Sequence, residues 1–315
     1  MSPFDFTHVL TSAVDELSDS RSFQGLFHQY KEGEPLPSGK SLARIVELAR
    51  AILFPGYFGN STVNNHTIGY HIGVNVEELF GLLTEQIRAG LCFGAANGSL
   101  CTDVPCRDQA ARLAAQFVAS LPTMRGILAT DVEAAYYGDP AATCLGEIIC
   151  CYPVIRAVTN YRIAHRLHEL GVPLIPRIIT EMAHAEVGID IHPGAQIGHH
   201  FTIDHGTGVV IGATCIIGNH VKLYQGVTLG AKSFPLDDNG HPIKGIPRHP
   251  ILEDGVIVYS NATVLGRITI ARGTIIGGNL WVTESTKPGE HLVQAKKRKT
   301  SKNDIIILPE DLGGL

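Results

Sequence analysis

The chain has 315 residues, of which 44% are hydrophobic and 17% charged, and its formal net charge is −5. This balance is typical of a soluble globular protein with room for two domains, and the charge gives no general reason to bind nucleic acid. Residues 1–10 contain no basic segment followed by a long apolar stretch, and no run of about 18 apolar residues occurs anywhere. The sequence therefore predicts neither a signal peptide nor a membrane span.

The cysteines indicate a reducing compartment. There are seven, an odd number, and they are scattered along the chain, which argues against a disulfide framework. In a reducing environment a buried cysteine behaves as a small apolar residue. We therefore expect free thiols and a cytoplasmic location.

Residues 1–187 are predicted to form a helical domain. Apolar residues recur at helical spacing over 41–53, 74–89 and 108–121. A further helix is predicted over 153–170, because Pro153 begins it and Gly171 follows it, and another over 175–187. Residues 57–73 are rich in glycine, asparagine and histidine and are expected to form a loop. The length of this part of the chain indicates a helical domain with its own assembly interface.

The second part of the chain has an apolar residue at nearly every sixth position. The main series consists of Ile191, Ile197, Ile203, Ile211, Ile217, Leu223, Leu229, Val258, Val264, Ile270, Ile276 and Val282. A period of six fits neither an isolated helix nor a single strand, but it fits a solenoid whose stacked coils share one core. Residues 188–290 are therefore predicted to form a parallel β-helix, followed by a C-terminal tail at 291–315. The predicted fold class is α+β.

The repeat is interrupted at two places, and interruptions of a regular repeat map to loops that often form the binding face. The step from Ile203 to Ile211 is eight residues long and contains Asp204-His205-Gly206-Thr207-Gly208. A polar insert at 231–250 ends in Arg248-His249-Pro250. We expect the chemistry of the protein to lie at these two interruptions.

His205 is a candidate general base. When a carboxylate holds one imidazole nitrogen, the other nitrogen is free to accept a proton, and the imidazolium that forms is stabilised. Asp190 precedes Asp204 by a little over two hexapeptides, so both can reach the same face of the solenoid. The alternative role of Asp190 is to cap the start of the first coil.

Several segments, in this order along the chain, resemble serine O-acetyltransferases, the hexapeptide-repeat enzymes of cysteine biosynthesis. They are 130–135, 139–141, 161–165, 190–198, 204–208, 227–230 and 248–250. The resemblance covers about residues 125 to 290 and implies a left-handed β-helix, an exception to the usual right-handed crossover. It also implies homotrimers with active sites between neighbouring subunits, and in some members dimers of trimers.

The activity implied by the resemblance is transfer of an acetyl group from acetyl-CoA to the hydroxyl of L-serine, which gives O-acetyl-L-serine. His205 would be the general base and Asp190 its orienting partner. The implied substrate-binding residues are Asp139, Asp204, Arg248 and His249. The two aspartates would hold the ammonium group of serine, while the arginine and histidine would meet its carboxylate and the developing oxyanion.

The residue types suit this chemistry. Direct attack of a serine hydroxyl on a thioester needs a general base but no nucleophile on the enzyme. We therefore expect acetyl-CoA as co-substrate, with no permanently bound cofactor and no metal. A groove of small residues would suit the pantetheine arm, and the candidates are Gly230, Ala231, Ser260 and Gly277. Glycine at the corner of a coil is alternatively explained by the turn itself.

The sequence departs from the family in three places. Ala213 follows Gly212, where the family commonly has an acidic residue. The loop at 233–246 is longer than the short glycine-rich loop of many members. The chain ends Leu312-Gly313-Gly314-Leu315, whereas many members end in an isoleucine that enters the active site of cysteine synthase, so a complex with that enzyme is not expected.

Three other functions are less well supported by the sequence. A hexapeptide acetyltransferase could use another small acceptor, although the aspartates and Arg248 favour a zwitterion over a sugar. A zinc hydratase of the β-helix carbonic anhydrase type would need three imidazoles, for which His205, His220 and His249 are candidates without a recognisable ligand spacing. A catalytically inactive scaffold is disfavoured because the expected polar residues are all present.

Overall fold

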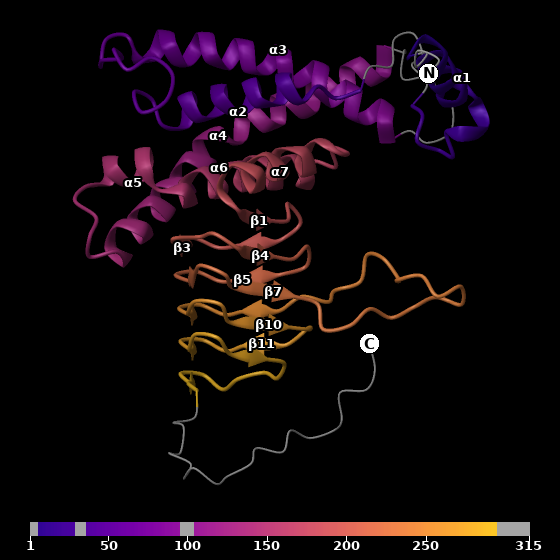
Figure 1. The fold of residues 1–315 in the computed structure, drawn as a ribbon. Coiled ribbons are helices and arrows are strands. Elements are labelled where there is room, and N and C mark those ends of the chain that lie inside the picture. The colour runs from indigo at the N-terminus through magenta and orange to yellow at the C-terminus, as the bar shows by residue number, and fades with distance from the viewer. Residues whose placement is uncertain (1–5, 29–35, 95–103, 295–315) are drawn as a thin grey trace.

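The computed structural model describes residues 6–28, 36–94 and 104–294. A helical region is followed by a stack of short parallel strands that runs away from it (Figure 1). Most of the predicted C-terminal tail, from residue 295 onward, lies outside the described residues. Within those ranges, none of the helices has the length and apolar character needed to cross a membrane.

The helices follow the predicted pattern, with extensions. The α-helices of the described ranges are α1 (Phe6–Ser18), α2 (Gly39–Leu53), α3 (Ile68–Gly94), α4 (Val104–Gly138), α5 (Leu145–Cys151), α6 (Pro153–Glu169) and α7 (Ile175–Val187). A 3-10 helix, η1, spans Ser20–Ser22. All five predicted helices are present, but α3 and α4 are longer than predicted. The prediction of a loop over 57–73 is wrong from Ile68 onward, because α3 begins there. Helices α1 and α5 were not predicted.

The strands form three parallel sheets that make the sides of a triangular prism. The first sheet contains β1 (Ile189–Ile191), β4 (Val209–Ile211), β7 (Thr228–Gly230), β10 (Thr263–Leu265) and β13 (Trp281–Val282). The second contains β2 (Gln196–Ile197), β5 (Ile216–Ile217), β8 (Ile251–Leu252) and β11 (Thr269–Ile270). The third contains β3 (Thr202–Asp204), β6 (Lys222–Tyr224), β9 (Ile257–Val258), β12 (Ile275–Ile276) and β14 (His291–Leu292). Three successive strands therefore close one coil, and the predicted parallel β-helix is confirmed.

The three edges of the prism are the turns between these sheets. Edge 1 joins the first sheet to the second and consists of residues 192–195, 212–215, 231–250 and 266–268. Edge 2 joins the second to the third, at residues 198–201, 218–221, 253–256 and 271–274. Edge 3 joins the third to the first, at residues 205–208, 225–227, 259–262 and 277–280. The long insert projects from edge 1 (Figure 1).

The hexapeptide series fills the inside of the prism. Leu223, Leu229 and Val258 are fully buried, and the other members of the series are buried too, except Ile197, which is partly exposed. A strand of two or three residues cannot bury its side chain alone, so the stacked coils stabilise one another through this shared core.

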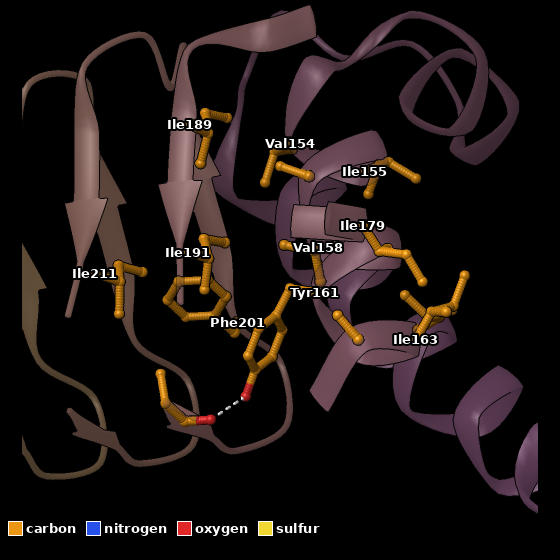
Figure 2. Packing of buried hydrophobic residues seen from close by; sticks show 14 of the residues in the cluster. Val154, Ile155, Val158, Tyr161, Ile163, Ile179, Ile189, Ile191, Phe201 and Ile211 are labelled. Carbon is orange, nitrogen blue, oxygen red and sulfur yellow. Dashed lines mark hydrogen bonds between the residues drawn. The ribbon is translucent and has the colours of Figure 1, made fainter. Parts of the chain in front are cut away.

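The helical region closes the first end of the β-helix. In Figure 2, Val158 and Tyr161 of α6 lie beside Ile191 and Phe201 of the first coil. The Tyr161 ring is fully buried, and its hydroxyl donates a hydrogen bond of 2.7 Å to the carbonyl oxygen of Ala195. A single hydrophobic core therefore continues from the helices into the coils.

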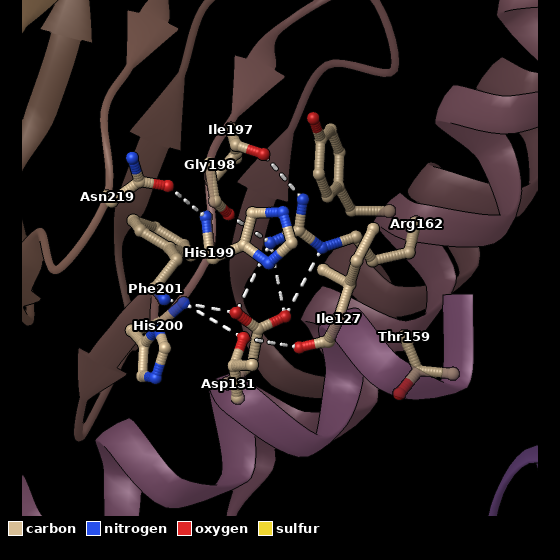
Figure 3. Close-up of polar contacts among 12 residues, drawn as sticks. Ile127, Asp131, Thr159, Arg162, Ile197, Gly198, His199, His200, Phe201 and Asn219 are labelled. Atoms are coloured by element: carbon tan, nitrogen blue, oxygen red, sulfur yellow. Dashed lines mark hydrogen bonds and ion pairs between the residues drawn. The ribbon is translucent and has the colours of Figure 1, made fainter. Parts of the chain in front are cut away.

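A buried ion pair fixes α4 and α6 on the same coil (Figure 3). Arg162 Nη2 lies 3.1 Å from Asp131 Oδ2, and the same guanidinium donates to the carbonyl oxygens of Ile197 and Gly198 at 2.6 and 2.7 Å. Asp131 also accepts a hydrogen bond from the backbone N–H of Phe201. Because its polar groups are mutually satisfied, this network holds the C-terminal half of α4 at a defined position over β3.

The cysteines only partly match the expectation of free thiols. Cys144, Cys150, Cys151 and Cys215 have free thiols, and burial raises the pKa of the Cys215 thiol to about 12. Cys106, however, is disulfide-bonded. The expectation is wrong at that residue, because an irregular cysteine spacing does not reveal which thiols the fold brings together.

Candidate active site

The site residues predicted from the sequence fall into two separate groups. Asp204 and His205 lie where the third sheet meets edge 3, with Asp139 of the helical region beside them. Arg248 and His249 lie on edge 1, at the end of the insert. Because these are different edges of the prism, one chain does not bring the two groups together.

Backbone conformation places His205 on the outside of the prism. His205 has a φ of 59°, and Gly206 and Gly208 have φ values of 91° and 82°. A Cβ atom at Gly206 would lie 2.4 Å from Ile189 Cδ1, so only glycine fits there. This left-handed turn accommodates the two extra residues of the eight-residue step, and it leaves the His205 side chain 72% exposed, with Nε2 3.7 Å from Asp204 Oδ1.

Asp139 is held in its ionised form. It follows α4 directly, and its Oδ2 accepts a hydrogen bond of 2.6 Å from the Tyr152 hydroxyl, while its Oδ1 accepts one from the backbone N–H of Ala141. These two bonds lower the pKa of the Asp139 carboxyl, and the positive fields of Lys222 and His205 add to the effect. The hydrogen bond between Tyr152 and Asp139 raises the pKa of Tyr152 to about 12, so the phenol stays protonated.

A small cleft lies between the end of α4 and the third sheet. It is lined by Ala135, Gly138, Asp139, Tyr152, Thr202, Ile203, Asp204 and Lys222. Lys222 was not predicted from the sequence. Its only signal is the register of β3 with β6, which pairs Thr202 with Lys222, and that register becomes visible only in the folded coil.

His249 is buried and held in one tautomer. Its side chain is 7% exposed and lies against Gly212, where a Cβ atom would approach His249 Cδ2 to 2.0 Å. The backbone N–H of Thr214 donates to Nδ1 at 3.1 Å, so the ring proton of the neutral form is on Nε2. Burial, together with the charges of Arg248 and Arg267, lowers the pKa of His249 to about 4. The residue is therefore a neutral hydrogen-bond donor near pH 7.

The end of the insert is fastened to edge 1 by residues that the sequence did not reveal. The backbone N–H groups of Arg248 and His249 both donate to Thr214 Oγ1, at 2.9 and 3.2 Å. Arg267 Nη1 donates to the carbonyl oxygens of Thr214 and His249, at 2.7 and 3.0 Å. The Arg248 guanidinium lies 5.8 Å from the centre of the Phe234 ring. Thr214 is thus the residue that orders this half of the site.

Asp190, the predicted orienting partner of His205, lies beside helix α7. Among the described residues, no hydrogen bond or ion pair joins the two side chains. The Asp190 carboxylate is instead close to Glu181 and His184 of α7. Each of the three residues offers one atom that could bind a metal ion, and these three atoms lie within 4.8 Å of one another. A role of Asp190 in orienting the imidazole stays a prediction.

The residues predicted to contact CoA are also divided between two edges. Gly230 and Ala231 lie where the first sheet meets edge 1, whereas Ser260 and Gly277 lie on edge 3. A Cβ atom at Gly230 would be 2.9 Å from Leu265 Cδ2, and one at Gly277 would be 2.9 Å from the Leu292 carbonyl oxygen. Close packing between coils is thus sufficient to explain both glycines.

The three histidines considered for a zinc site lie on three different edges. His205 is on edge 3 and His249 on edge 1, while His220 is on edge 2, where its ring stacks on His200 with centroids 4.2 Å apart. The group at Glu181, His184 and Asp190, identified among the described residues, includes none of the three.

Known proteins similar to the chain are serine acetyltransferases, although no family model matches it. A relative from Synechococcus elongatus, named "Serine acetyltransferase, plasmid", is 50% identical over 266 residues, covering 84% of this chain and 83% of the relative. The crystal structure of Entamoeba histolytica serine acetyltransferase 1 in complex with L-cysteine is similar, with a TM-score of 0.69 and 33% identity over 89% of this chain and 94% of that one. Soybean serine acetyltransferase complexed with serine has a TM-score of 0.52 and 26% identity over 84% of this chain and 99% of that one. Because the identity to the Synechococcus relative extends over most of both proteins, the chain belongs to the serine acetyltransferase family.

Proposed function

We propose that the protein transfers the acetyl group of acetyl-CoA to the hydroxyl of L-serine. The observation that carries the proposal is the exposed imidazole of His205 beside Asp204 and Asp139, on a fold and sequence shared with serine acetyltransferases. The similar Entamoeba and soybean structures hold L-cysteine and serine, which are amino acids with the same ammonium and carboxylate groups. An acceptor of this kind suits a site that combines carboxylates with an arginine.

His205 is the proposed general base. It accepts the proton of the serine hydroxyl while the oxygen attacks the thioester carbon, and the tetrahedral intermediate then collapses with cleavage of the C–S bond. The proton passes to the departing CoA thiolate, so the imidazole is neutral again at the end of the cycle. Asp139 and Asp204 hold the ammonium group of serine, and no covalent enzyme intermediate is needed.

The division of the site between two edges supports a homotrimer. We place edge 3 of one subunit against edge 1 of the next, because a threefold arrangement of prisms then repeats the same contact three times. In this arrangement His249 of the neighbouring subunit donates from Nε2 to the developing oxyanion, and Arg248 binds the serine carboxylate. Further pairing of trimers through the helical region stays a prediction.

The same arrangement gives a place for acetyl-CoA as co-substrate. Gly230 and Ala231 of one subunit and Ser260 and Gly277 of its neighbour would line one seam, although they are separate within a chain. The pantetheine arm would then run along the seam with its thioester near His205. The role of Asp190, on the first sheet, as the orienting partner of His205 stays a prediction.

The proposal is tested by measuring CoA thiol release from acetyl-CoA with a panel of amino acids and sugars, with light scattering on the same sample. We expect turnover with L-serine, much less with other amino acids and none with sugars, from a particle of at least trimer mass. Turnover with a sugar and not with serine would favour the alternative acceptor class. Metal analysis of the purified protein tests the zinc hydratase alternative. A cytoplasmic location and the absence of a cysteine synthase complex stay predictions.

A further inference from the structure

Lys222 lies at the centre of the edge 3 group, although no sequence motif identified it. Its Nζ is 3.1 Å from Asp204 Oδ2 and donates a 2.7 Å hydrogen bond to the carbonyl oxygen of Gly138. The same ammonium lies 4.6 Å from the centre of the Tyr224 ring. One side chain therefore joins the last residue of α4, the last residue of β3 and an aromatic face of β6.

The ion pair is largely shielded from water. The Lys222 and Asp204 side chains are 16% and 18% exposed. Burial alone would lower the pKa of Lys222, but its contacts with Tyr224 and Asp204 outweigh burial and raise it. The lysine is therefore charged near pH 7, and the charge is held in place rather than moving freely in solvent.

The contact with Gly138 has a second physical basis. Gly138 is the last residue of α4, whose final carbonyl groups lack partners within the helix and carry partial negative charge. An ammonium group at this end of a helix is stabilising for that reason. Asp139 is the next residue in the chain, so the contact of Lys222 with Gly138 also helps to fix the position of Asp139.

We propose that Lys222 is a positioning residue that holds Asp204 against the end of α4 and offsets its charge beside His205. The inference rests on the proposed function and deepens it. Two carboxylates and one lysine leave the site with a single excess negative charge, which matches one substrate ammonium. The lysine thus favours an acceptor with one amino group, and it limits the negative field that acts on the imidazole.

The charged groups around His205 allow the effect to be predicted with its sign. Asp204 Oδ1 lies 3.7 Å from His205 Nε2, and Asp139 interacts electrostatically with His205. Lys222 contacts the other carboxylate oxygen of Asp204. Tyr152 is neutral because it keeps its hydroxyl proton, which it donates in a hydrogen bond to Asp139. Without the lysine charge, the Asp204 carboxylate would face the imidazole unpaired and favour the imidazolium, which cannot accept a proton. The acid limb of the activity profile would then move to higher pH.

The experiment compares Lys222→Met, Lys222→Gln and Lys222→Arg in the full-length protein, with Lys287→Met as an exposed control on the last coil. The pH dependence of kcat/KM for serine, KM for acetyl-CoA and thermal unfolding are measured for each variant. In the Met and Gln variants we expect the acid limb to move up by about one pH unit, so that kcat/KM on that limb falls about tenfold. The Arg variant should keep the original limb because it keeps the charge, and KM for acetyl-CoA should change less than about twofold in all of them.

Two outcomes overturn the inference. If the folded Gln variant has an unmoved acid limb, the lysine charge does not act on the base. If the Arg variant shifts as far as the Met variant, the contact depends on shape and not on charge. The Gln variant keeps a hydrogen-bond donor, so the test stands even if the Met variant does not fold. Absence of serine acetylation by the unmodified protein would instead refute the proposed function.

Discussion

Edges 1 and 3 of the β-helix hold the same residue type in opposite states. His205 on edge 3 is 72% exposed, lies next to a carboxylate and sits on a left-handed turn. His249 on edge 1 is 7% exposed, and burial together with two arginines lowers its pKa to about 4. The first environment suits an imidazole that accepts a proton, and the second suits one that stays neutral and donates a hydrogen bond. Environment rather than residue type decides the two roles.

The two edges also differ in how they are built. Edge 1 depends on close packing, because His249 occupies the space left by the missing side chain of Gly212, and Thr214 meets its ring. Edge 3 depends on a strained turn and on an ion pair between Asp204 and Lys222. Substitutions at the two edges should therefore act in different ways: by disturbed packing at edge 1 and by altered charge at edge 3.

The largest effect is expected for His205→Asn. Loss of a general base should lower turnover by about 10²- to 10⁴-fold, while thermal unfolding should hardly change because the side chain is mostly exposed. Steady-state kinetics and a thermal melt check both expectations, and His66→Asn, at another exposed histidine, serves as the control. Retained turnover in the variant would remove His205 from the mechanism.

The division of the site between subunits can be tested by mixing. His205→Asn and His249→Gln should each be poorly active alone, because each lacks one half of every site. If the halves meet across subunits, equal mixing and reassembly restores both histidines at about a quarter of the sites, by random choice of neighbours. Activity of the mixture should then approach about a quarter of the unmodified protein. If the mixture is no more active than either variant alone, the two histidines either act within one chain or do not belong to the same site.

A smaller effect is expected for Gly212→Ala. The new Cβ atom would lie 2.0 Å from His249 Cδ2, so the buried ring must move. Overpacking of this kind costs about 1–3 kcal/mol in stability, and turnover should fall as well because the donor is displaced. Chemical unfolding and kinetics measure the two effects, with Gly126→Ala, which has open space around its Cβ, as the control. Unchanged kinetics in a destabilised variant would separate His249 from catalysis.

The sequence was informative wherever a local pattern determines structure. The apolar residue at every sixth position predicted the buried positions of the β-helix, such as Ile203 and Leu223. The eight-residue step predicted that His205 lies on the outside of the prism. Lys222 and Thr214 could not be found in this way. Lys222 contacts a residue of the preceding coil, and Thr214 contacts the end of the long insert. Neither contact follows a fixed spacing that can be counted along the sequence.

Asp190 shows a further limit of pattern-based prediction. Counting hexapeptides placed it on the same face as Asp204, but the count does not describe the helices that pack against the first coil. In the folded chain its carboxylate lies near Glu181 and His184 of α7. The resemblance to a family supplied the expected pairing with His205, and that pairing stays a prediction.

A further effect is expected on the pH dependence of stability, and it arises at edge 1. His192 and His249 both have a pKa lowered to about 4, chiefly by burial, so the unfolded chain, with a value near 6.5, binds protons more readily than the folded one. The stabilisation from keeping these rings neutral is complete above about pH 6.5 and is lost as the pH falls toward about 4. Chemical unfolding between pH 7 and about 4 should therefore show decreasing stability, with a shallower slope in His249→Gln. Because the exposed ring of His205 contributes no comparable burial, His205→Asn should keep the original slope, and an equal flattening in both variants would show that the loss of stability does not arise at edge 1.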